Sequence, residues 1–161
     1  MDTISPAVIQ IIQAMLAPGL GISAVGLLLL GLNNRYSTII NRIRLLNDEK
    51  RKLHKALVDG RSLEYAENLR LMSVTKQSSE LLIRSRLVRN AILSHQTAIG
   101  LFVLTSLAIG ISPFADSPVL REGALFLFMG GMVAVLVGIL FGAAEVRRSF
   151  RIVLLEVKAE E

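Results

Sequence analysis

Three long stretches of this sequence contain no charged side chain, and this constrains the fold more than any other feature. Residues 3 to 34, 90 to 115 and 123 to 144 lack Asp, Glu, Lys and Arg, and they are 32, 26 and 22 residues long. A helix needs roughly 20 apolar residues to cross a hydrocarbon core about 30 Å thick. Each stretch is therefore long enough to span a membrane. The mean hydropathy of +0.55 excludes a disordered chain.

The distribution of Lys and Arg predicts the orientation, because these residues are retained on the cytoplasmic side of a membrane. Residues 35 to 89 carry 13 Lys or Arg against 6 Asp or Glu, and a group of arginines follows the third stretch. The N-terminal tip and residues 113 to 122 have a small excess of acidic residues. We therefore expect a multi-pass protein with its N-terminus outside and its C-terminus in the cytoplasm.

The sequence predicts an all-α membrane protein with three transmembrane helices and a long cytoplasmic antiparallel helical hairpin between spans 1 and 2. We expect the first span to be a transmembrane helix of the mature protein rather than a cleaved signal peptide, because it is far longer than the apolar core of a secretory signal. The expected segments are a tip with span 1 (1–34), the hairpin (35–89), span 2 (90–115), an external loop (116–122), span 3 (123–146) and a cytoplasmic tail (147–161).

The hairpin carries apolar residues at alternating spacings of three and four, which is typical of a coiled-coil seam. Neither proline nor glycine interrupts residues 32–58 or 63–98, so both hairpin helices should continue the spans without a break. Asp59 to Ser62 should end one helix and cap the next. A polar stretch, Ser73 to Glu80, is expected opposite the first part of the seam, which would then lack an apolar partner within the chain.

We therefore expect the seam to pack against neighbouring copies of the chain in a homo-oligomer. Contact with lipid headgroups or with the base of span 3 is the alternative. The predicted seam residues are Ile39, Ile43, Leu46 and Leu53.

Spans 2 and 3 carry one-sided faces of small and hydroxyl residues. Such faces let transmembrane helices approach closely, and hydroxyls bond across them. The alternative is that the hydroxyl stripe lines a water-filled path, although no titratable residue lies at mid-membrane. The candidate polar stripe is Ser94, Thr97, Thr105 and Ser112, and the predicted helix-packing glycines are Gly131, Gly138 and Gly142.

Two titratable residues near the inner boundary attract attention. Glu145 ends the small-residue face of span 3, and we expect it to form an interfacial ion pair with Arg42 or Arg44, where span 1 leaves the membrane. His95 is expected as a polar residue at the membrane boundary, with a proton-responsive group as the alternative.

The segment from Asn33 to Leu46 has Asn34-Arg35 followed by Arg42-x-Arg44. With Ser5-Pro6 and a glycine-rich first span, it resembles an uncharacterised family of small bacterial inner-membrane proteins with three helices. The resemblance covers nearly the whole chain. It implies a bacterial inner-membrane location and three spans, and it transfers no activity.

Catalytic chemistry finds little support in this sequence. The chain has no Cys, only two His, and neither metal-ligand spacing nor a nucleophile and base, so we expect no enzyme, cofactor or metal site. No RNA-binding motif is present, so the net charge of +5 points to anionic lipid rather than nucleic acid. We expect a homo-oligomeric, ion-conducting channel-like assembly. The alternative is a non-conducting accessory or scaffold subunit whose basic hairpin binds a partner protein or anionic lipid.

Overall fold

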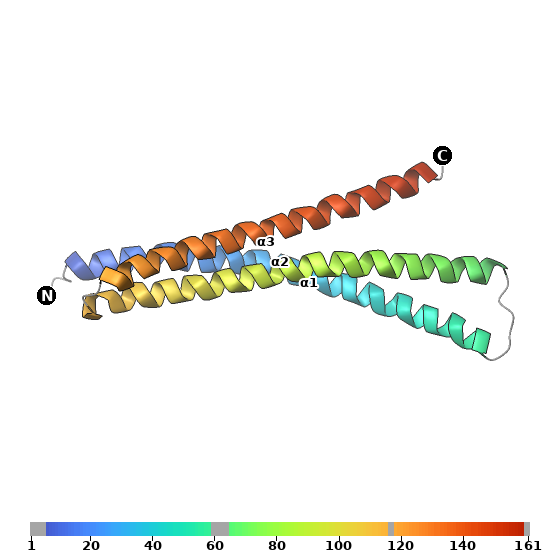
Figure 1. Cartoon of the computed structure of the whole chain (residues 1–161), viewed down its shortest axis with the longest axis horizontal. Coiled ribbons are helices and arrows are strands. Elements are labelled where there is room, and N and C mark those ends of the chain that lie inside the picture. The colour runs from blue at the N-terminus through green and yellow to red at the C-terminus, as the bar shows by residue number, and fades with distance from the viewer. Residues whose placement is uncertain (1–5, 59–64, 116–117, 160–161) are drawn as a thin grey trace. The chain divides into compact units, whose positions relative to one another are not determined.

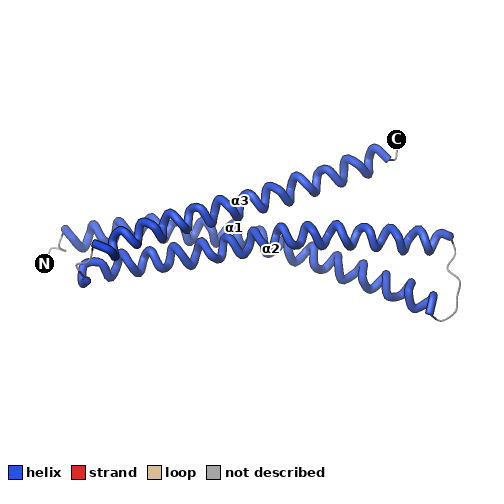
Figure 2. Tube along the Cα trace, in the orientation of Figure 1, coloured by secondary structure: helices blue, strands red, loops and turns tan. Residues whose placement is uncertain are grey.

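The computed structural model describes residues 6–58, 65–115 and 118–159, and every one of these residues is helical. The helices are α1 (Pro6–Val58), α2 (Tyr65–Ala115) and α3 (Pro118–Ala159) (Figure 1, Figure 2). The expected all-α class is confirmed, and so is the continuation of spans 1 and 2 into the polar segments. The predicted turn at Asp59 to Ser62 lies outside the described residues.

Each helix is long and apolar enough to cross a membrane. The chain is accordingly a multi-pass membrane protein with three candidate spans. Many large apolar side chains on these helices are exposed in the isolated chain, Leu27, Phe126 and Leu140 among them. In a bilayer such side chains meet lipid at no cost, because lipid tails are as apolar as the side chains themselves.

The chain divides into two compact units that share the three helices. One comprises residues 1–32 and 90–141, and we call it the apolar unit; the other comprises 33–89 and 142–161, and we call it the basic unit. These boundaries fall within three residues of the ends of the charge-free stretches. The division by contacts thus follows the division by charge.

Phe102 of α2 lies at the centre of the apolar unit, where only 1% of its surface is exposed. It forms a cluster with Val25 and Ala98, and its ring centroid lies 5.6 Å from that of Phe128. A Cβ built on Gly131 would lie 2.5 Å from a Phe102 ring carbon, closer than real side chains approach. Gly131 therefore gives α3 the space that this large ring needs, as the expected role in helix packing requires.

The basic unit has its own buried stripe, and this stripe corrects one expectation. Ile39, Ile43 and Leu46 expose only 7, 8 and 7% of their surface in the single chain. They do not lack cover within the chain, which was the premise for a seam between copies. Leu53, the fourth predicted seam residue, is half-buried.

The sequence did not show this because α2 has a buried face that begins within the polar stretch and continues to Val88. Its buried residues recur at spacings of four and three. Serine is small enough to lie in such a face, and Ser85 satisfies its hydroxyl by donating to the carbonyl oxygen of Leu82 at 2.8 Å. The buried face consists of Val74, Ser78, Leu81, Ser85 and Val88.

Candidate functional site

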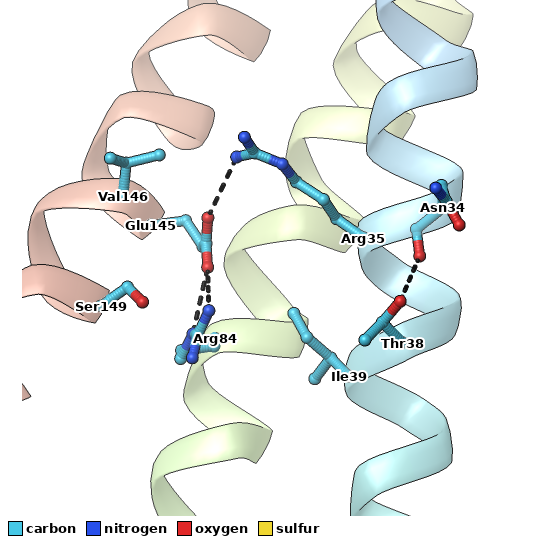
Figure 3. A pocket seen from close by; sticks show the side chains of 8 residues that line it. All are labelled: Asn34, Arg35, Thr38, Ile39, Arg84, Glu145, Val146 and Ser149. Atoms are coloured by element: carbon cyan, nitrogen blue, oxygen red, sulfur yellow. Dashed lines mark hydrogen bonds and ion pairs between the residues drawn. The ribbon is translucent and has the colours of Figure 1, made fainter. Parts of the chain in front are cut away.

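A buried carboxylate held by two arginines is the most polar arrangement in the basic unit. Glu145 of α3 exposes only 4% of its surface. Arg84 of α2 donates to Glu145 Oε1 from Nε at 3.0 Å and from Nη2 at 2.8 Å. Arg35 of α1 places Nη1 3.8 Å from Glu145 Oε2 (Figure 3). The three helices thus each contribute one charged residue to a single cluster.

The two arginines have different roles. Arg84 is partly buried and uses two of its N–H groups on the carboxylate, which offsets the cost of removing Glu145 from water. Arg35 keeps 62% of its side chain exposed, and its pair with Glu145 is too long for a hydrogen bond. Two guanidinium groups and one carboxylate leave one net positive charge. Arg35 is the more exposed of the two arginines, so the solvent-facing charge of the cluster is on Arg35.

This cluster forms the wall of a pocket of about 520 Å³. Its side chains come from all three helices and combine cationic, amide, hydroxyl and apolar groups (Figure 3). The hydroxyl of Thr38 is already committed, because it donates to the carbonyl oxygen of Asn34 at 3.0 Å. The pocket is lined by Asn34, Arg35, Thr38, Ile39, Arg84, Glu145, Val146 and Ser149.

The expected pairing of Glu145 with Arg42 or Arg44 differs from the structure. Both arginines are exposed, and the partners of Glu145 are Arg84 and Arg35. Arg42 and Arg44 lie about two turns beyond Arg35 along α1, which is about 10 to 14 Å at 1.5 Å per residue. Arg35 belongs to the Asn34-Arg35 motif, and this motif is the sequence signal that points to Arg35 as a functional residue. Arg84 was not predicted, because which arginine of α2 pairs with Glu145 depends on how α2 aligns with α3.

Two further ion pairs link helices within the basic unit. Arg148 Nη2 lies 3.3 Å from Glu80 Oε2. Arg70 donates from Nε and Nη2 to the two carboxylate oxygens of Glu49 at 2.7 and 3.2 Å. This forked hydrogen bond lowers the pKa of the Glu49 carboxyl below its ordinary value and raises that of Arg70. Both groups are exposed, so solvent screens the pair and its contribution to stability is small.

The predicted polar stripe of span 2 does not share one environment. Thr105 is buried, Thr97 is exposed, and Ser94 and Ser112 are half-buried. Thr97 and Thr105 donate to the carbonyl oxygens of Leu93 and Leu101 at 3.0 and 2.8 Å, and Ser112 donates to that of Ile109 at 2.9 Å. These three hydroxyls bond to their own helix rather than across helices.

His95 lies in the core of the apolar unit rather than at an exposed boundary position. Its Nδ1 is 2.7 Å from the carbonyl oxygen of Ala91, which can only accept, so Nδ1 carries the proton. The other ring nitrogen, Nε2, is buried without a hydrogen-bond partner. A Cβ on Gly138 would overlap the His95 ring, whereas one on Gly142 would meet nothing within 4 Å. Gly138 therefore serves close packing, and Gly142 does not do so in the single chain.

Within the described ranges, no group of three or more His, Cys, Asp or Glu side chains is arranged to hold a metal ion. Comparison with known proteins gives one match. A family model described as "Protein of unknown function (DUF2721)" matches residues 15–155. No curated protein and no solved structure matches the chain.

Proposed function

Since the chain belongs to the DUF2721 family, whose function is unknown, we propose its role from the arrangement of its charges. It is a non-conducting accessory or scaffold subunit of the bacterial inner membrane, and its basic hairpin engages anionic lipid. In this proposal the hairpin is antiparallel and cytoplasmic, and the N-terminus lies outside.

The observation that carries the proposal is a belt of arginines next to the spans. Residues 33–46, 80–89 and 142–149 contain eight Arg, two Glu and no Lys. The lysines of the chain lie farther from the charge-free stretches. We call these eight residues the arginine belt: Arg35, Arg42, Arg44, Arg84, Arg86, Arg89, Arg147 and Arg148.

Arginine and lysine differ in the way that matters at a lipid headgroup. The guanidinium is a planar fork that binds phosphate through two parallel hydrogen bonds, whereas ammonium acts as a compact point charge. The cytoplasmic leaflet carries anionic lipid, and each basic residue near its surface contributes about 1 kcal/mol of attraction. A belt composed only of arginine therefore favours a lasting contact with lipid phosphates.

The apolar unit supports the non-conducting part of the proposal. A water-filled path would need polar groups directed into it. The hydroxyls of Thr97, Thr105 and Ser112 instead donate to carbonyl oxygens one turn back along α2. The centre of the unit is the apolar cluster around Phe102.

Lipid preference around the belt can be tested with a tryptophan reporter, because the chain has no Trp of its own. Leu93 is 52% exposed and lies one turn from Arg89 at the start of the second charge-free stretch, so Leu93→Trp reports on the lipid beside the belt without entering the core. We expect brominated phosphatidylglycerol to quench this tryptophan more strongly than brominated phosphatidylcholine, and high salt to reduce the difference because salt screens charge. Equal quenching by the two lipids would contradict the proposal.

A conducting homo-oligomer is the second candidate function. The exposed amides of Gln13 and Gln96 favour it, because polar groups at membrane depth face protein or water rather than lipid, and a second copy would cover them. Proteoliposomes loaded with a potassium- or proton-sensitive dye separate the two functions. Flux no greater than that of protein-free liposomes supports the scaffold, and protein-dependent flux supports the channel.

A further inference from the structure

We propose that the pocket between Arg35, Arg84 and Ser149 is a binding site for a phosphate group, namely that of an anionic phospholipid. The inference rests on the proposed engagement of anionic lipid and assigns it to one site. The belt supplies general attraction, whereas this pocket supplies a defined set of hydrogen-bond donors.

The donors that remain available in the pocket suit an anion. Arg35 has five N–H groups and, within the described part of the chain, uses none of them in a hydrogen bond. The side-chain amide of Asn34 on α1 and the hydroxyl of Ser149 on α3 line opposite sides of the pocket and can also donate (Figure 3). Charged, amide and hydroxyl donors that line one pocket suit the several acceptor oxygens of a phosphate.

Glu145 does not prevent anion binding, because its charge is already neutralised. Both hydrogen bonds from Arg84 end on Oε1 of the carboxylate. The carboxylate therefore holds Arg84 in place. Arg35 shares the same carboxylate only through an ion pair of 3.8 Å, so two guanidinium groups and one carboxylate leave one net positive charge in the pocket. The pocket has a fixed, buried base and a cationic, exposed rim.

Along the helices, Arg35 and Glu145 lie at the depth of lipid phosphates, and Arg84 lies at the outer edge of the headgroup region. Arg35 directly follows the first charge-free stretch, and Glu145 directly follows the third. Arg84 precedes the second stretch by six residues, which is about 9 Å at 1.5 Å per residue. The headgroup region extends roughly 5 to 8 Å beyond the hydrocarbon core on each side.

Size and apolar lining favour a lipid over a small free anion. The volume of about 520 Å³ lies within the usual range of ligand sites, about 300 to 1,000 Å³. Two of the eight lining residues, Ile39 and Val146, are apolar. They lie beyond Arg35 and Glu145 from the spans and offer an apolar surface for the carbon atoms of a headgroup glycerol, which inorganic phosphate lacks.

The site is tested with the purified full-length protein in detergent, by the rise in melting temperature on titration of three probes. These are dioctanoyl phosphatidylglycerol, dioctanoylglycerol, which has no phosphate, and inorganic phosphate. A ligand that binds only the folded protein raises its melting temperature according to its affinity. We expect phosphatidylglycerol to stabilise the protein and dioctanoylglycerol not to do so. Equal stabilisation by these two would overturn the proposal.

The third probe identifies the source of the phosphate. Inorganic phosphate without effect at the same concentration indicates that the natural ligand is a lipid. Inorganic phosphate with an equal effect supports a phosphate site and overturns the assignment to lipid.

Variants assign the binding to the pocket. Arg35→Gln should weaken phosphatidylglycerol binding about tenfold, the effect of one lost charge-assisted hydrogen bond. Arg35→Lys keeps the charge without the fork and should fall between Arg35→Gln and the wild type. Lys76→Gln removes an exposed charge outside the belt and should leave binding unchanged. Unchanged binding in Arg35→Gln would overturn the proposal.

A further variant predicts an effect of opposite sign. Glu145→Gln lowers the melting temperature of the lipid-free protein but raises the net charge of the pocket by one. We therefore expect tighter phosphatidylglycerol binding in this variant, which a purely structural role of Glu145 does not predict. Weaker binding would count against the site.

The failure of this inference is distinguishable from failure of the proposed function. Arg86 belongs to the belt, is exposed, and lies outside the pocket. If Arg86→Gln weakens binding as much as Arg35→Gln, the belt attracts lipid without a defined site, and only the inference fails. If the Leu93→Trp reporter shows no preference for anionic lipid, the proposed function fails.

Discussion

Glu145 is a buried carboxylate of the basic unit, and hydrogen bonds from Arg84 offset its charge. Glu145→Gln keeps the shape and removes the charge, which leaves Arg84 partly buried without its partner. Removing one member of a buried pair costs about 3 kcal/mol. We expect a fall of several degrees in melting temperature in detergent.

Glu49→Gln is the matched control for this substitution. It makes the same chemical change in a pair whose members are exposed, and exposed pairs contribute little. If Glu49→Gln lowered the melting temperature as much as Glu145→Gln, burial would not determine how much the Glu145–Arg84 pair contributes to stability.

Two glycines of α3 form a second matched comparison. Gly138→Ala places a methyl group against the buried ring of His95, and overpacking of this kind costs about 1 to 3 kcal/mol. Gly142→Ala meets nothing within 4 Å, so it should be neutral or slightly stabilising because alanine is the better helix former. Thermal unfolding of both variants checks this, and equal destabilisation would reject the packing of His95 on Gly138.

The Glu49–Arg70 pair also predicts a dependence on pH. The hydrogen bond from Arg70 lowers the pKa of Glu49 in the folded protein below its ordinary value of 4.5. The stabilisation is therefore present above about pH 4.5 and is lost as pH falls through the lowered folded pKa. Arg70 stays charged throughout this range. The difference in melting temperature between wild type and Glu49→Gln should shrink from pH 7 to pH 3, and a constant difference would contradict this assignment.

At the scale of an element, α1 presents different faces within a few residues of one another. Ile43 is buried, whereas Leu45, two residues farther along, is 70% exposed. Ile43→Lys places a charge in the core of the basic unit and should cost about 3 kcal/mol or more. Leu45→Lys should have little effect. Melting temperature measures the difference, and light scattering reports whether particle size also changes.

The result separates two roles of the stripe. Because Ile43 is buried in the single chain, we expect the isolated chain itself to lose stability. An Ile43→Lys protein that keeps its melting temperature but forms smaller particles would instead indicate a contact between copies.

The elements of this fold are largely predictable from sequence, for a clear physical reason. Long charge-free stretches and the scarcity of helix breakers determine where helices form and that α1 and α2 continue beyond the spans. These are local properties of the chain. A helix repeats every 3.6 residues whatever lies beside it, so local patterns are sufficient.

The partners of individual side chains were less predictable, because they depend on how helices align. Ser78 belongs to the predicted polar stretch, yet it lies in a buried face together with Ser85. Composition does not show that the Ser85 hydroxyl bonds to its own helix, nor that the Ser78 hydroxyl is buried without a hydrogen-bond partner. The choice of Arg84 rather than Arg42 or Arg44 as the partner of Glu145 likewise needs the alignment of α2 with α3.

At the scale of the whole molecule, contact and charge divide the chain at nearly the same residues. The apolar unit holds the centre of each charge-free stretch, and the basic unit holds the arginine belt. All eight belt residues come from segments that directly adjoin the charge-free stretches. The account therefore requires that these segments emerge on one side of the membrane and meet the same leaflet.

Topology is the measurement that tests this requirement most directly. Because the chain has no Cys of its own, each introduced cysteine is the one site at which a maleimide can react with a thiol. Single cysteines at residues 2, 60 and 117 and at the C-terminus are treated in intact cells with a membrane-impermeant maleimide. We expect labelling at residues 2 and 117, and protection at residue 60 and at the C-terminus until the cells are permeabilised, because Lys and Arg are retained in the cytoplasm. Labelling of residue 60 in intact cells would place the arginine belt outside and contradict the account.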